Sequence, residues 1–105
     1  MLQVSTDTDF ENLIKTHDKV VVKYFADWFG SCKLFAPKFK RHANSEDNAD
    51  VLFLDVNAEE NETARKLGGV DNLPFIATFK NGVLLEGSAT SKEEYLQKMI
   101  TDLRS

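Results

Sequence analysis

The pattern of apolar and polar positions divides the chain into short helices and strands. Four segments carry apolar side chains at a spacing of three and four residues, which is typical of helices that bury one face. These predicted helices span 7–17, 33–43, 59–67 and 91–103. Two dense runs of β-branched and aromatic residues, 19–26 and 51–56, predict strands that are buried on both faces.

The last third of the chain contains a strong hairpin signal. Asn81-Gly82 fits a type I′ turn and separates two strand-like runs, 75–79 and 83–85. With a short opening strand near 2–4, strands and helices alternate through the first half of the chain. This alternation indicates parallel strands joined by crossover helices, with the hairpin added at one edge. The predicted fold class is therefore α/β with a mixed sheet.

Residues with capping chemistry mark the predicted helix ends. Thr6 or Asp7 is expected to cap the first helix, and a Ser91–Glu94 capping box is expected to open the last one. Gly68 and Gly69 are expected to stop the third helix.

Length and charge restrict the class of protein. A chain of 105 residues with 42% hydrophobic content is the size of one ordinary domain, so we expect a single domain spanning 1–105. A net charge of −4 argues against nucleic acid as an obligatory partner, because phosphate binding needs clustered Lys and Arg. The sequence shows neither a long apolar run nor a signal-peptide pattern, so we expect no membrane association and a cytoplasmic location.

Cysteine and histidine are too few for a disulfide framework or a metal site. Cys32 is the only cysteine, so neither an intrachain disulfide nor a cysteine-based zinc site can form. His17 and His42 have no Asp or Cys at ligand spacing and are expected at the surface. We therefore expect no metal and no cofactor, and any chemistry has to involve Cys32.

Several sequence pieces together resemble the thioredoxin family, and the resemblance covers essentially the whole chain. The pieces are the strand 20–26 running into Trp28, Gly30-x-Cys32-Lys33, Phe35-Ala36-Pro37, Leu54-x-Val56, and Leu73-Pro74 followed by Phe79-Lys80-Asn81-Gly82. The resemblance implies a thioredoxin fold, in which helices flank a central mixed sheet of parallel strands with a C-terminal antiparallel hairpin. For a complete family member it also implies protein-disulfide reductase activity.

The resemblance further implies a peptide-binding surface around the turn that follows the second strand. Its residues are Trp28, Gly30, Ser31, Leu73 and Pro74, with Pro74 in the cis form. In the family, the backbone beside this proline pairs with an extended substrate segment.

The turn lacks one of the two thiols that the family's chemistry requires. An exposed thiolate attacks the substrate disulfide, and a second thiol three residues later resolves the mixed disulfide. By the resemblance, Phe29 stands at the attacking position and Cys32 at the resolving position, so the ordinary two-thiol cycle is excluded. The sequence leaves two interpretations of Cys32 open: a small buried apolar residue, or a slow monothiol favoured by its place in the first turn of a helix.

Three further residues depart from the family pattern. Lys23 stands where the family usually carries a buried Asp beneath the resolving cysteine, and Asp55 stands where some members carry a facing Lys. A lone buried ammonium is costly, so we expect a charge-swapped ion pair between Lys23 and Asp55 under Cys32. The alternative is that Lys23 extends its ammonium to the surface. Ser31 replaces a proline and can serve as the N-cap of the helix.

Two classes of function remain. We favour a thioredoxin-like protein of thiol/disulfide redox homeostasis that has lost its dithiol site. It binds a peptide or protein partner at the Trp28, Phe29 and Pro74 surface, with at most monothiol chemistry at Cys32. The alternative is an active disulfide oxidoreductase that uses Cys32 with glutathione or another thiol, or an engineered variant of a dithiol thioredoxin. Whether the chain is an enzyme and which partner it binds stay open, and we expect a monomer or a weak dimer.

Overall fold

The computed structural model of the chain describes residues 2–105. The strands in this range are β1 (Leu2–Val4), β2 (Lys19–Phe25), β3 (Leu52–Asn57), β4 (Phe75–Lys80) and β5 (Val83–Ala89). The helices are α1 (Phe10–Thr16), α2 (Gly30–Ala43), α3 (Glu62–Gly68) and α4 (Glu93–Leu103), with a short 3₁₀ helix η1 (Glu46–Asn48). Every strand and helix that the sequence pattern predicts is present, which confirms the α/β class.

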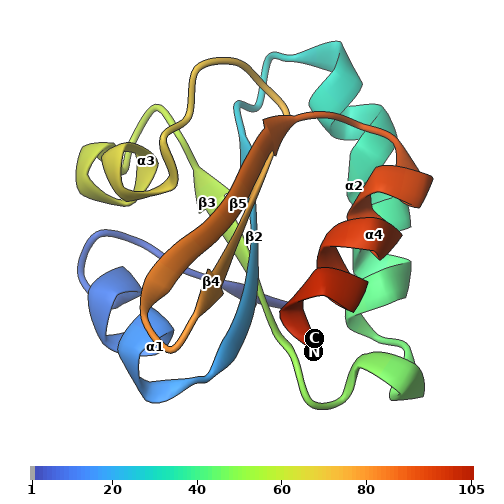
Figure 1. Cartoon of the computed structure of the whole chain (residues 1–105). Coiled ribbons are helices and arrows are strands. Elements are labelled where there is room, and N and C mark those ends of the chain that lie inside the picture. The colour runs from blue at the N-terminus through green and yellow to red at the C-terminus, as the bar shows by residue number, and fades with distance from the viewer. Residues whose placement is uncertain (1) are drawn as a thin grey trace.

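The strands form one sheet, in the order β1-β3-β2-β4-β5. β1 and β2 pair parallel with β3, whereas β4 pairs antiparallel with both β2 and β5. Figure 1 shows α1 and α3 on one side of this sheet and α2 and α4 on the other. The end of β2 lies beside the start of β4, so the turn into α2 and the loop before β4 meet at one end of the sheet (Figure 1).

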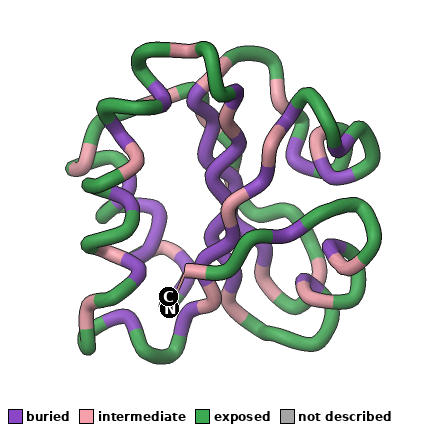
Figure 2. Tube along the Cα trace, turned by 180° about the vertical axis from the view of Figure 1, so that it is seen from behind, coloured by how far each residue is buried: buried purple, intermediate pink, exposed green. Residues whose placement is uncertain are grey.

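The sheet separates two apolar clusters, one on each face. On the side of α1 and α3, Phe10 packs edge-on against Phe79, with ring centroids 5.7 Å apart. On the side of α2 and α4, Phe39 packs against Phe53 at 5.6 Å and joins the apolar face of α4. Figure 2 shows the buried part of the trace concentrated in the central strands. Both faces of the sheet are therefore covered, as dense apolar strands require.

Tyr24 explains why α3 ends in two glycines. Its hydroxyl donates a hydrogen bond of 2.8 Å to the Ala64 carbonyl oxygen, and burial raises the pKa of Tyr24. A Cβ atom on Gly68 would lie 2.5 Å from that hydroxyl oxygen, so a larger residue does not fit. Gly69 ends the helix at a φ of 69°, in the left-handed region that glycine adopts without strain. The predicted helix stop at these glycines is confirmed.

The predicted cap of α1 is wrong, because the residue is used elsewhere. Asp9 rather than Thr6 or Asp7 occupies the N-cap position of α1. The Asp7 carboxylate instead accepts hydrogen bonds from the Thr63 and Ala64 N–H groups at the start of α3, at 3.2 and 2.8 Å. A capping residue can thus serve a helix that is distant in sequence, and only the tertiary structure shows which helix it serves.

The predicted capping box of α4 is also wrong. Lys92 occupies the N-cap, and its own side chain makes no capping hydrogen bond. The Lys92 N–H group is bound by the Thr90 hydroxyl oxygen at 3.1 Å, so the preceding loop sets the start of the helix and Ser91–Glu94 does not.

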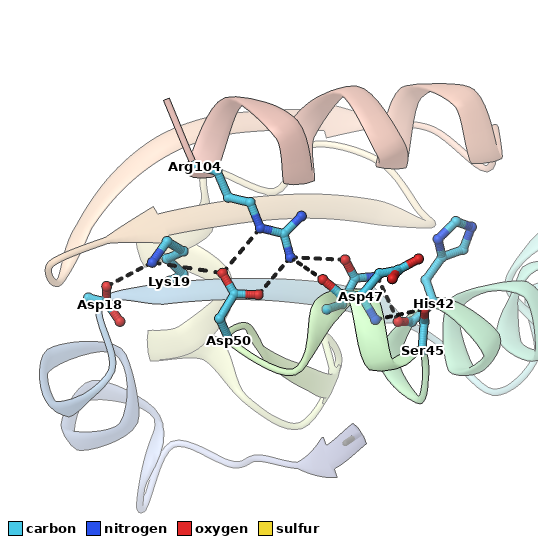
Figure 3. Close-up of polar contacts among 8 residues, drawn as sticks. Asp18, Lys19, His42, Ser45, Asp47, Asp50 and Arg104 are labelled. Atoms are coloured by element: carbon cyan, nitrogen blue, oxygen red, sulfur yellow. Dashed lines mark hydrogen bonds and ion pairs between the residues drawn. The ribbon is translucent and has the colours of Figure 1, made fainter.

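A polar cluster fastens the C-terminal end of α4 to the rest of the fold (Figure 3). Arg104 binds the Asp50 carboxylate through Nε at 3.1 Å and Nη2 at 2.6 Å. The same Nη2 atom donates to the Asp47 carbonyl oxygen and to Asn48 Oδ1, at 2.8 and 3.1 Å. Lys19 Nζ lies 3.9 Å from the Asp50 carboxylate. The hydrogen bonds from Arg104 are the main reason that the pKa of Asp50 falls to about 2.

Replacing Arg104 with Ala is expected to remove a contribution to stability that depends on pH. The pKa of Asp50 falls from its ordinary value of 3.8 to about 2 on folding, so the unfolded chain binds more protons between these values. The stability advantage of the wild type over Arg104→Ala is therefore complete above pH ~4 and shrinks as the pH falls toward ~2. Urea unfolding of both proteins across this range measures the advantage, with Lys38→Ala as an exposed-cation control. A difference that stays constant with pH would contradict the expectation.

Candidate functional site

Backbone hydrogen bonds build the turn between β2 and α2. The Phe29 N–H group donates to the Ala26 carbonyl oxygen at 3.2 Å, and the Phe29 carbonyl oxygen accepts from the N–H groups of Cys32 and Lys33 at 3.1 and 3.3 Å. Phe29 is therefore the N-cap of α2, and no side chain makes a hydrogen bond at this cap. Ser31 lies inside the helix, so the expectation that it caps α2 is wrong.

Trp28 and Phe29 form an aromatic pair on one side of this turn. Trp28 is 67% exposed, and its ring centroid lies 5.4 Å from that of Phe29. The indole Nε1 donates a hydrogen bond of 2.9 Å to Glu59 Oε2, from the segment that follows β3. Sequence reasoning missed Glu59, because a surface carboxylate near a predicted helix start carries no signal of this contact.

A groove of about 280 Å³ lies beside the aromatic pair. Trp28, Phe29 and Leu73 line it together with residues from α3 and from the segments before and after it, which are Ala58, Glu59, Arg65, Val70, Asp71 and Asn72. The Leu73–Pro74 peptide bond is cis, and Pro74 itself is buried. Residues 30 and 31 were also predicted to belong to the peptide-binding surface. Both are exposed at the start of α2, and neither lines the groove.

Cys32 faces a different cavity. Its residue surface is 4% exposed, and it is not among the residues that line the groove. It instead lines a cavity of about 200 Å³ with Lys23 and Asp55, completed by Phe25, Ala26, Asp27, Lys33 and Ala36. The thiol and the aromatic pair therefore line two different cavities.

Lys23 and Asp55 sit opposite each other on neighbouring strands. The parallel register of β2 and β3 aligns the two residues, and Lys23 Nζ lies 3.0 Å from Asp55 Oδ1. The side chain of Lys23 is 4% exposed and that of Asp55 is 20% exposed, so Lys23 does not extend to the surface. Its ammonium also lies 5.5 and 5.3 Å from the ring centroids of Phe25 and Phe39, within the range of cation–π attraction.

The ion pair joins two opposite charges in surroundings that include the rings of Phe25 and Phe39. Asp55 Oδ1 is buried and accepts no hydrogen bond from the residues that the structure describes. At 3.0 Å the two charges still attract strongly, since the surroundings are largely apolar.

The two histidines lie apart from this site. His42 was expected at the surface and is half-buried, with Nε2 3.5 Å from Glu93 Oε2, whereas His17 is exposed. Within residues 2–105, no group of three or more His, Cys, Asp or Glu side chains could hold a metal ion. None of the helices described in this range combines the length and hydropathy needed to cross a bilayer.

The sequence matches one protein family over nearly its whole length. The family model described as Thioredoxin covers residues 1–102. The chain belongs to the thioredoxin family. Thioredoxin-1 of Schizosaccharomyces pombe is 33% identical over 84 residues, which cover 80% of this chain and 80% of that protein. The protein disulfide-isomerase of Medicago sativa is 32% identical over 80 residues, which cover 72% of this chain and 16% of that protein.

Solved structures of the thioredoxin family share this fold. Malassezia sympodialis thioredoxin (Mala s 13) superposes with a TM-score of 0.89 at 26% identity, covering 99% of this chain and 94% of that one. Fasciola hepatica thioredoxin gives a TM-score of 0.85 at 30% identity, covering 95% and 97%. The thioredoxin fold expected from the sequence is therefore confirmed.

The thiol chemistry open to this thioredoxin-family chain is narrow. Cys32 is its only cysteine, so it cannot close an intrachain disulfide. One thiol can still form a mixed disulfide with another molecule or be oxidised to a sulfenic acid. Cys32 is buried and lines the cavity with Lys23 and Asp55, so little of the residue is open to other molecules.

Proposed function

We propose that this chain is a thioredoxin-like binding module of thiol/disulfide redox homeostasis that has given up the dithiol reaction. Phe29 takes the place of the attacking cysteine, and the groove beside it holds an extended segment of a peptide or protein partner. The observation that carries the proposal is the separation of the two cavities. Trp28, Phe29 and Leu73 line the groove, whereas the single thiol of Cys32 lies outside it.

The chemistry of the groove supports binding without reaction. Trp28 and Phe29 offer two large aromatic surfaces, the kind of residue that dominates binding energy at protein interfaces. The hydrogen bond to Glu59 fixes the Trp28 ring in advance, which lowers the entropy cost of binding. Apolar Val70 and Leu73 extend the surface. An extended segment laid along such a groove can add backbone hydrogen bonds in the manner of an additional strand.

The alternative function is disulfide reduction through Cys32 with glutathione or another thiol. The main difficulty for this alternative is that a substrate disulfide bound in the groove would not contact the thiol of Cys32, which does not line the groove. Insulin reduction driven by dithiothreitol or by glutathione distinguishes the two functions. The binding module gives turnover near the uncatalysed background, and strong turnover would establish the alternative.

Replacing Phe29 with Ser is expected to weaken peptide binding by more than about tenfold, or about 1.4 kcal/mol, because it removes an aromatic anchor. Trp28 is the only tryptophan in the chain and lines the groove, so its fluorescence reports occupancy directly. The probe is isolated insulin B chain with its cysteines blocked, which tests binding in the absence of thiol exchange.

Lys38→Ser is the matched control, since Lys38 is exposed on α2 and does not line the groove. It should bind the B chain as the wild type does. A Trp28 signal that does not change with B chain, or equal affinities for Phe29→Ser and wild type, would refute the proposed groove.

A further inference from the structure

The groove beside Trp28 and Phe29 contains a cation that its apolar walls do not explain. Arg65, from the middle of α3, lines the groove and is half-buried. Its guanidinium makes no ion pair and no hydrogen bond with any residue in the described range 2–105. A guanidinium that is partly withdrawn from water is stabilised by acceptor atoms, because all its N–H groups are donors.

The carboxylates around Arg65 do not supply these acceptors. Glu62, on the same helix, binds Lys66 at 2.8 Å, and Lys66 is the main reason that the pKa of Glu62 is lowered, with a smaller effect from the charge of Arg65. Glu59 accepts the indole hydrogen bond described above. Asp71 also lines the groove, but it is exposed, and no ion pair within the described residues joins it to Arg65. The guanidinium is therefore free to bind a ligand.

The exposure of the charged groups decides which ligand charge the groove favours. Glu59 and Asp71 are both exposed, so each stays hydrated and a cationic side chain would gain little from them. The same hydration weakens their repulsion of an anion. Arg65 is the charged side chain of the groove that is half-buried, and its planar fork can bind both oxygens of a carboxylate. The balance favours an acidic group.

We propose that the groove selects an extended peptide segment with an acidic side chain among apolar residues, and that Arg65 binds its carboxylate. The apolar residues of the segment contact Trp28, Phe29 and Leu73, which line the same groove. Recognition of an acidic motif by arginine is a recurring mode of peptide binding. The inference rests on the proposed binding function and adds a specificity-determining residue to it.

Three capped synthetic peptides test this preference. They share a frame of glycine, alanine and valine and differ only at the central position, which carries glutamate, glutamine or lysine. Trp28 fluorescence measures the Kd of each peptide at low salt. The glutamate peptide should bind about fivefold more tightly than the glutamine peptide, and the lysine peptide no better than the glutamine peptide. The preference for glutamate should shrink in ~0.5 M sodium chloride, which screens the charges.

Substitutions on α3 and in the loop after it assign the preference to its residue. Arg65→Gln should bind the glutamate and glutamine peptides equally, whereas Arg65→Lys should keep part of the preference, because an ammonium has charge but no fork. Asp71→Asn should strengthen binding of the glutamate peptide, since it removes a like charge from the groove. Lys66→Gln is the matched control: Lys66 is 71% exposed, does not line the groove and carries the same charge as Arg65. It should keep the wild-type preference, and melting curves check that each variant is folded.

The outcomes separate this inference from the binding function on which it rests. Equal affinities of wild type for the glutamate and glutamine peptides would overturn the inference and leave groove binding intact. Tighter binding of the lysine peptide, or a preference for glutamate that persists in Arg65→Gln, would overturn it as well. If no peptide changes the Trp28 signal, the inference fails, and the insulin B chain then decides whether the proposed binding function fails with it.

Discussion

Replacing Asp55 with Leu is expected to destabilise the protein by about 3–5 kcal/mol, the usual cost of breaking a buried ion pair from one side. The variant leaves the Lys23 ammonium without its carboxylate, in a position where the side chain is only 4% exposed. Domains of ordinary stability unfold at a cost of about 5–15 kcal/mol, so the loss is a large share of the total.

Replacing Lys23 in place of Asp55 should lower the free energy of unfolding by a smaller amount. Lys23→Met leaves Asp55 unpaired, but that side chain is 20% exposed and can recover some hydration. Methionine also fits the apolar surroundings between Phe25 and Phe39. The double variant Lys23→Met with Asp55→Leu should recover most of the lost stability, because replacing a buried pair with packed apolar residues is often close to neutral.

Urea unfolding at neutral pH measures these three variants as a double-mutant cycle. The control is the exposed pair Lys66 and Glu62 on α3, whose side chains are 71% and 66% exposed. Glu62→Leu should leave the free energy of unfolding nearly unchanged, because exposed ion pairs contribute little. If Asp55→Leu costs no more than this control, the buried pair contributes nothing and its role at the site has to be reconsidered.

Replacing Phe29 with Cys is expected to create disulfide reductase activity at least about tenfold above background, which corresponds to about 1.4 kcal/mol of barrier. The new thiol lies at the N-cap of α2, where the positive end of the helix favours a thiolate. It also lies in the groove, within reach of a substrate disulfide. The Cys32 N–H group already bonds the carbonyl oxygen of residue 29, so the resolving thiol is one helical turn away.

Insulin reduction driven by dithiothreitol measures this gain. Phe29→Ser is the matched control, since it opens the groove without adding a thiol and should stay at background. Phe29→Cys combined with Cys32→Ser should form a stable mixed disulfide and release no product, because no thiol resolves it. A folded Phe29→Cys protein at background would show that the site has lost more than one sulfur.

Much of the fold follows from local sequence features. The apolar spacing located all four helices, and the β-branched runs and the Asn81-Gly82 turn located the strands. The ends of the elements were less predictable. Asp7 caps α3 because the fold brings it next to Thr63 and Ala64, and a residue can cap any helix start that it meets in space.

The candidate site was predictable in part. The pairing of Lys23 with Asp55 was expected from the family resemblance, and the parallel register of β2 and β3 places the two residues side by side. The contact between Trp28 and Glu59 could not, since no local signal connects residues on separate loops.

The sequence by itself determined the succession of elements and the presence of one thiol, and the family resemblance identified Lys23 at the position of a buried Asp. These depend on residue type and spacing along the chain. The tertiary structure alone decided that the groove beside Trp28 and Phe29 is separate from the cavity that Cys32 lines. The reason is geometric. Residues 29 and 32 are neighbours along the backbone of the same turn, but the packing around each side chain decides which cavity that side chain lines.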